Sequence, residues 1–425
     1  MSASIADRRF TARRAPDAPA AREAQLLVCC VRVAPERAAR LRSLVAEGID
    51  WQRAIHMASR QVVLPLVYRC LDAEFAQALP AQAAESLRRA YAGNSVRSLH
   101  LARELIRLSA VLERSGIEAI AIKGPALAVA AYGSVTMRQF SDLDLLVRKE
   151  EVARAVALLQ GEGYALGPGY SLADLERRGG FEIAMGRDDA LTEVDLHWRL
   201  APPYFPITLE DEGLWRRAVR VEIEGAAVRT LAAADHLLFL CVHGAKHGWQ
   251  ALGSVCDVAA LIRAAAPGPC ADASPMKPAA SAIDWEDLAD RAERAGAVRA
   301  LLLGVLLAHE VLDAAVPAAL LERARRAPAI VRAARSFIAY VNDPGDGGPG
   351  LFQRWLVPLA VIESPAARVR YFAARALLPS ADDRRLLRLP AALRPLYFLL
   401  RPLRVMLKEG PAMMRRRAAS ARGDR

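Results

Sequence analysis

The chain has 425 residues, 53% of them hydrophobic, and a formal net charge of +11. This length is enough for two or three hydrophobic cores. No run of about 18 apolar residues occurs, which argues against an integral membrane protein.

The positive charge raises the question of a nucleic-acid partner. Arginines are scattered through Ala- and Leu-rich stretches, which is typical of solvated helix faces. A nucleic-acid reader should instead show a clustered patch or stacking aromatics. We therefore expect no nucleic-acid partner. Six cysteines without CxxC spacing argue against a disulfide framework or a zinc site, so we expect reduced thiols in the cytoplasm.

The first part of the chain predicts helices after a disordered lead-in at residues 1–25. Asp50 precedes a helical pattern that Pro65 interrupts, and residues 86–115 predict one long helix. His56 lies on a mostly apolar helix, which favours a buried core histidine over a functional one.

Two carboxylates occupy one predicted strand at residues 142–147. Side chains alternate along a strand, so Asp142 and Asp144 point the same way, roughly 7 Å apart at their backbones. Such like charges repel, and the pair usually persists because a cation lies between them. The alternative is a pair of turn or edge-strand acids.

A turn and a short helix precede that strand. Residues 117–122 predict a strand, Lys123-Gly124-Pro125 a sharp turn, and the residues up to Tyr132 a short helix. Gly124 lets the backbone approach a ligand, and Pro125 suits the first turn of a helix whose free N–H groups favour an anion. Lys123 is either a phosphate ligand or a solvated turn lysine. Together these features predict a site for a nucleotide phosphate with magnesium.

Two further strands are expected at residues 181–185 and 191–200, with a turn at residues 186–189. In the second strand, Asp195 and His197 share a face with Glu193. Asp195 is thus a third carboxylate available to the first two. An exposed strand face is the alternative for all three residues, and the favoured one for Glu193 and His197.

The chain is predicted to become helical again from Trp215 onward. Thr230 is expected to cap a helix that places three polar residues within one turn: His243, Lys246 and His247. Asp257 on the next helix would complete a metal site, but HGAKH lacks the Glu of an HExxH zinc motif. Two interpretations remain: a polar cluster that joins helices to the sheet, or a contribution to the substrate cleft.

The segment LRPLYFLLRPLRVMLKEGP at residues 393–411 is both apolar and basic. It is too short to span a bilayer, and its two Arg-Pro pairs argue against one continuous helix. Packing against the protein's own core is the leading interpretation. Peripheral docking on an anionic membrane is the alternative.

The central stretch resembles the polymerase-β-like nucleotidyltransferase superfamily, in particular its bacterial branch of uncharacterised nucleotidyltransferase family proteins. That branch has K-G-x-x-L, a Tyr-Gly pair, an Arg, and then S-D-[IL]-D-L-L-V. The chain has the matching residues Lys123, Gly124, Leu127, Tyr132, Gly133, Arg138, Ser141, Asp142, Asp144 and Val147. The resemblance covers most of residues 26–408. It departs from the wider superfamily where Lys-Gly replaces the usual Gly-Ser of the phosphate helix.

The resemblance implies an α/β (α+β) fold with a small mixed sheet embedded in helical N- and C-terminal domains. The expected organisation is a lead-in at 1–25, a helical region at 26–97, the nucleotidyltransferase core at 98–200, a helical domain at 201–340, an amphipathic segment at 341–410 and a basic tail at 411–425.

The resemblance also implies magnesium-dependent transfer of a nucleoside monophosphate, from a nucleoside triphosphate such as ATP to an acceptor, with release of pyrophosphate. Asp142 and Asp144 would hold two magnesium ions, and Asp195 would ligate the one that binds the acceptor hydroxyl. The expected triphosphate ligands are Lys123, Gly124, Arg138 and Ser141. The expected substrate-cleft residues are His197, His243, Lys246 and His247.

The acceptor implied by resemblance is a small molecule, sugar or peptide. Three alternatives stay open: phosphoryl instead of nucleotidyl transfer, a non-catalytic module that binds nucleotide or a partner protein, and a nucleic-acid-modifying enzyme. The module would be favoured if Asp195 lay far from Asp142 and Asp144.

Overall fold

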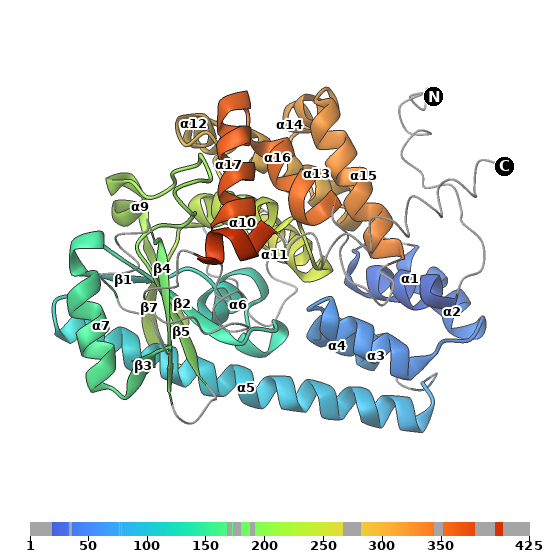
Figure 1. Ribbon diagram of the computed structural model, residues 1–425. Helices are drawn as coiled ribbons and strands as arrows, with labels where there is room; N and C mark the ends of the chain where they lie inside the picture. The colour runs from blue at the N-terminus through green and yellow to red at the C-terminus, as the bar shows by residue number, and fades with distance from the viewer. Residues whose placement is uncertain are drawn as a thin grey trace.

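The computed structural model describes residues 19–33, 36–75, 77, 79–167, 172, 180–187, 192–266, 282–343, 352–378 and 396–402. The predicted basic tail lies outside these residues. A mixed seven-stranded sheet forms one side of a largely helical molecule, and most of the helices lie beside it (Figure 1). This architecture confirms the predicted α/β fold class.

Five helices form the N-terminal region: α1 (Pro19–Val31), α2 (Arg37–Ala46), α3 (Trp51–Arg60), α4 (Leu64–Phe75) and α5 (Ala81–Arg114). Helix α1 begins inside the stretch that was expected to be disordered, because its buried side chains, such as Leu26 and Leu27, pack in the helical core. Asp50 directly precedes α3, and its carboxylate caps that helix by accepting from the Arg53 N–H at 3.0 Å. Helix α5, 34 residues long, extends from these helices to the sheet (Figure 1).

The predicted strand–turn–helix–strand unit is present as β1 (Ala119–Ala121), α6 (Gly124–Tyr132), the 3₁₀ turn η2 (Val135–Met137) and β2 (Asp142–Val147). Gly124 has a φ of +58°, and a Cβ there would lie 3.4 Å from the Asp142 carbonyl oxygen. Pro125 occupies the first turn of α6, as expected. Glycine is therefore required where the turn passes the start of β2.

The chain continues through η3 (Lys149–Glu151), α7 (Val152–Gly161), β3 (Tyr164–Leu166), β4 (Glu182–Arg187) and β5 (Glu193–His197). The strand order is β3-β4-β5-β2-β1-β7-β6. Strand β2 runs parallel to β5, and β1 runs parallel to β7, whereas the other neighbours are antiparallel. The first half of the predicted turn at residues 186–189 belongs to β4, which includes Gly186 and Arg187, and the second half lies outside the described residues.

The prediction of continuous helix from Trp215 is wrong for residues 219–230. After α9 (Glu212–Arg217), β6 (Val219–Ile223) and β7 (Ala226–Thr230) form a hairpin at the sheet edge. Val221, Ile223 and Val228 are buried on alternate positions, and Glu224-Gly225 takes positive φ at the two-residue turn. Thr230 does not cap a helix, because its hydroxyl donates to the Ala121 carbonyl oxygen at 2.6 Å.

The remaining helices are α10 (Ala233–His247), α11 (Leu252–Ala264), α12 (Trp285–Arg294), α13 (Val298–Leu312), α14 (Ala318–Arg325), α15 (Pro328–Asn342), the π turn η5 (Phe352–Leu356), α16 (Val357–Val361) and α17 (Pro365–Leu377). Their apolar faces join those of α1–α4 in one core, and a second core lies between the sheet, α5 and α7. No helix in the described ranges is long and apolar enough to cross a membrane.

His236 links α10 to the sheet. Its fully buried ring places Nε2 2.9 Å from the Ile122 carbonyl oxygen. Burial lowers the pKa of His236 to about 4, although the contact with Ile122 favours the charged form. The folded protein therefore holds this ring neutral at a pH where the unfolded chain takes up a proton.

We expect the free energy of unfolding to decrease by about 3 kcal/mol, owing to His236, as pH falls from about 6.5 to about 4. This contribution is fully present above pH 6.5 and is lost through the lower range. Urea denaturation at a series of pH values checks it. His236→Gln should flatten the dependence on pH, whereas His56→Gln, at an exposed histidine, should leave it unchanged. Equal pH dependence in all three proteins would contradict the prediction.

Candidate active site

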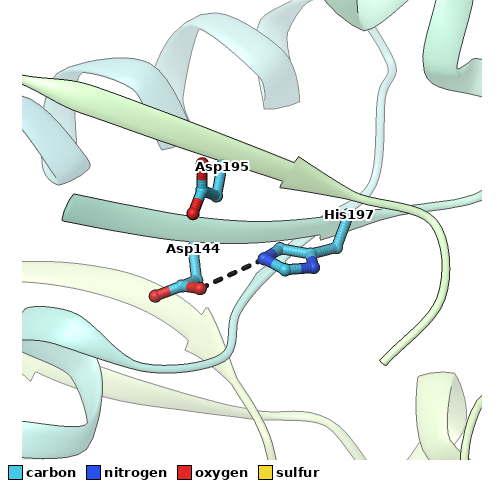
Figure 2. A group of neighbouring side chains, drawn as sticks. All are labelled: Asp144, Asp195 and His197. Atoms are coloured by element: carbon cyan, nitrogen blue, oxygen red, sulfur yellow. Dashed lines mark hydrogen bonds and ion pairs between the residues drawn. The ribbon is translucent and has the colours of Figure 1, made fainter. Parts of the chain in front are cut away.

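The parallel pairing of β2 and β5 brings the predicted carboxylates together. Asp144 is directly opposite Asp195, and Asp142 is opposite Glu193. Asp144, Asp195 and His197 each offer an oxygen or nitrogen atom within 4.8 Å of the other two (Figure 2). In the described part of the chain, this is the only group of three or more such residues arranged to hold a metal ion.

Asp144 is the centre of this group and is almost completely buried. Lys123 Nζ lies 2.9 Å from Asp144 Oδ1, and His197 Nε2 lies 3.1 Å from the same oxygen. Asp144 Oδ2 is buried and has no hydrogen-bond partner among the described residues. Oδ1 is thus held in place by two contacts, while Oδ2 stays available to a ligand. Lys123 is an ion-pair partner of the cluster and not a solvated turn lysine.

The site shifts the pKa values of its carboxyl groups in opposite directions. Burial raises the pKa of Asp144, but the Lys123 charge and the His197 hydrogen bond outweigh it and hold that pKa well below its usual range. Burial, followed by the Asp144 charge, raises the pKa of Asp195 to about 7 and also raises that of Asp142. Crowded, desolvated carboxylates of this kind need a cation, and a buried oxygen without a partner fits a hard ion such as Mg²⁺.

A cavity of about 420 Å³ opens beside the cluster. Its wall includes five of the predicted residues: Lys123, Arg138, Ser141, Asp142 and Asp144. It adjoins a larger groove of about 980 Å³ between α3 and α5, because Asn94, Arg97 and Gln139 line both. His56 is exposed and lines this groove, so the expectation that it is buried is wrong.

Arg138 lies at the cavity wall, but its guanidinium is already engaged. Its Nη2 lies 3.0 Å from Asp257 Oδ2, and its Nε lies 3.1 Å from Asp257 Oδ1. The Tyr132 hydroxyl donates to the same carboxylate at 2.8 Å. Asp257 therefore ties α11 to the chain before β2. With its carboxylate engaged in this way, Asp257 does not complete a metal site with His243 and His247.

The three predicted substrate-cleft residues of α10 differ in how far they are buried. Lys246 is 9% exposed, and its Nζ lies 5.1 Å from the centre of the Phe181 ring. Burial lowers the pKa of Lys246, while the nearby charges of Glu182, Asp144 and Asp195 raise it. The ammonium is thus beside the acidic cluster, as the cleft interpretation requires. The His243 and His247 rings lie 4.5 Å apart, and His247 is exposed.

Two residues near the cluster, Glu182 and Arg97, are not among those predicted from the sequence. Glu182 begins β4, pairs in register with His197, and places Oε2 3.3 Å from His197 Nδ1. Its position at the start of a predicted strand was a usable signal. Arg97, in the middle of α5, had no signal, because it is one of many arginines along that helix.

The model of a family described as uncharacterised nucleotidyltransferase matches residues 47–313, more than half of the chain. The chain belongs to this nucleotidyltransferase family. A solved antigenic nucleotidyltransferase-like protein from Paracoccidioides brasiliensis is also similar, with 15% sequence identity, a TM-score of 0.30, and coverage of 52% of this chain and 96% of the other. No curated protein matches the chain. Membership of the nucleotidyltransferase family confirms the resemblance predicted from the sequence.

Proposed function

We propose that this family member is a magnesium-dependent nucleotidyltransferase. It would move a nucleoside monophosphate from a nucleoside triphosphate to an acceptor hydroxyl and release pyrophosphate. The observation that carries the proposal is the parallel register that sets Asp195 against Asp144, beside the Lys123-Gly124 turn. The non-catalytic module is disfavoured, because that alternative predicts Asp195 far from Asp142 and Asp144, whereas Asp195 lies opposite Asp144.

The triphosphate would lie in the 420 Å³ cavity, with its phosphates at Lys123, Ser141 and the first backbone N–H groups of α6. Asp142 and Asp144, the latter through its free Oδ2, would hold two magnesium ions, and Asp195 would ligate only the ion at the acceptor hydroxyl. Magnesium, when bound, would neutralise phosphate charge and lower the pKa of the acceptor hydroxyl. Lys123 would then exchange part of its contact with Asp144 for a phosphate oxygen.

The acceptor would approach from the Asp195 side, where Lys246, Glu182 and Phe181 lie. By family resemblance it is a small molecule, sugar or peptide. Its hydroxyl oxygen attacks the α-phosphorus, the bond from that phosphorus to the pyrophosphate oxygen breaks, and the hydroxyl proton passes to the Asp195 carboxylate. The pyrophosphate leaves with both electrons of the broken bond.

The product released from the triphosphate tests this proposal. The protein is incubated with each magnesium triphosphate and a mixture of sugars, amino acids and peptides, and the products are separated by ion exchange. Pyrophosphate in equal amount to a new nucleotidylated product is the expected result. Nucleoside diphosphate with a phosphorylated product would instead establish phosphoryl transfer.

Arg97 should contribute to triphosphate binding, because it lines both the cavity and the groove and is exposed toward them. Loss of one charge-assisted contact to phosphate is expected to weaken binding by about tenfold in Arg97→Ala. Calorimetric titration with magnesium ATP measures this. Arg103→Ala removes an exposed arginine of the same helix that lines neither cavity, and it should bind as the wild type does. Equal weakening in both variants would indicate only a long-range charge effect.

A further inference from the structure

Large apolar side chains are exposed mainly at the C-terminal end of the described chain. Of the twelve large hydrophobic residues that are exposed in the described part of the chain, nine lie between residues 356 and 400. We define the C-terminal apolar patch by six of them: Val369, Phe372, Leu377, Phe398, Leu399 and Leu400. Exposed apolar residues that cluster in this way usually mark an interaction surface, whereas single scattered ones do not.

The patch is made by two adjoining segments, α17 and the short helical turn at residues 396–402. Arg401 Nη2 donates to the Arg375 carbonyl oxygen at 3.3 Å, which joins the two segments. One buried tyrosine anchors each of them: Tyr371, 1% exposed, against Phe205, and Tyr397, 4% exposed. With these anchors inward, Phe372 and Leu399 point outward, and Leu399 is 73% exposed.

The two segments that form the patch carry a net positive charge. Residues 352–378 and 396–402 contain a single acid, Glu363, and five arginines: Arg354, Arg368, Arg370, Arg375 and Arg401. Arg370 is exposed on α17 between patch residues, and Arg375 lies over the Trp355 ring at 5.3 Å from its centre. Arg370 is the exposed arginine of the five, and the other four are half-buried, so the two segments combine exposed apolar side chains with a net positive charge that is most accessible at Arg370.

We propose that the C-terminal apolar patch docks on a membrane surface of anionic lipids. Leucine and phenylalanine side chains would enter the boundary between headgroups and acyl chains, and the exposed Arg370 would pair with a lipid phosphate. A second copy of the chain fits poorly, because a two-fold contact would bring arginines against arginines with one acid from each copy. An anionic bilayer offers the apolar and the negative component on one surface.

The test is co-sedimentation of the full chain with phosphatidylcholine vesicles, with and without one third phosphatidylglycerol, at low and high salt. We expect binding to the anionic vesicles only, weakened by salt. Phe398→Ser/Leu399→Ser and, separately, Arg370→Glu should each lower the partition coefficient by about tenfold or more. Val96→Ser, which changes an exposed valine of α5, is the matched control and should bind like the wild type.

Several outcomes would overturn the proposal. One is the absence of binding to anionic vesicles, and another is equal binding by wild type and both patch variants. A third is light scattering that shows a wild-type dimer that the double variant dissociates, since the patch would then be a contact between copies. Magnesium triphosphate binding, measured on the same samples, is expected to be unchanged in the patch variants, which separates this proposal from the proposed function.

Discussion

Asp195→Asn is expected to lower the rate of pyrophosphate release by about a thousandfold, a loss typical of removing a group that takes a proton in the transition state. Asp195 faces Asp144 from β5 and is the carboxylate proposed to accept the acceptor's proton. The triphosphate is proposed to be held mainly by Lys123 and the Asp142/Asp144 strand. Its magnesium-dependent affinity should therefore change by no more than about threefold.

The Asp195→Asn substitution is expected to reduce the rate of pyrophosphate release without a matching loss of triphosphate affinity. Rates are followed with a coupled pyrophosphate assay and the acceptor mixture, and affinities by calorimetry. Glu193→Gln is the matched control, because Glu193 is exposed on the same strand face, two residues from Asp195. A variant that loses triphosphate affinity as strongly as rate would assign Asp195 to nucleotide binding alone.

Asp257→Ala is expected to lower the free energy of unfolding by about 3–5 kcal/mol, because it leaves a buried guanidinium without its partner. Arg138 and Asp257 side chains are only 13% and 8% exposed, and the Tyr132 hydroxyl would also lose its acceptor. Urea denaturation measures the change. Glu322→Ala breaks the exposed pair with Arg326 and should cost less than about 1 kcal/mol. Similar small effects in both variants would show that the Arg138–Asp257 pair is not a stabilising link.

The strand that carries Asp142 and Asp144 could be predicted, because the alternation of side chains along a strand depends only on the local sequence. Alternation put Asp142 and Asp144 on one face, and the same rule put Asp195 with His197. The contact between the two strands required the pairing of β2 with β5, which the family resemblance implied but the alternation of side chains does not. The same limit applies to Lys123, since its contact with Asp144 depends on how the turn passes β2.

Other features depended on distant parts of the chain. The predicted helix at residues 219–230 is the β6–β7 hairpin in the structure, and its alternating Val and Ile residues around Glu224-Gly225 are a usable sequence signal for it. The engagement of Arg138 by Asp257 joins residues 119 positions apart, and no local pattern predicts it. Lys246 reaches the cluster only because α10 packs against the sheet, so sequence spacing left its role open between two interpretations.

The central claim is that Asp142 and Asp144 form a metal-dependent triphosphate site. Calorimetric titration of each nucleoside triphosphate, with and without magnesium, into the wild type and Asp142→Ala/Asp144→Ala tests it most directly. We predict that at least one triphosphate binds the wild type only with magnesium, and that the double substitution removes this binding while circular dichroism shows a folded protein. Magnesium-dependent binding that persists in the folded double variant would contradict the account.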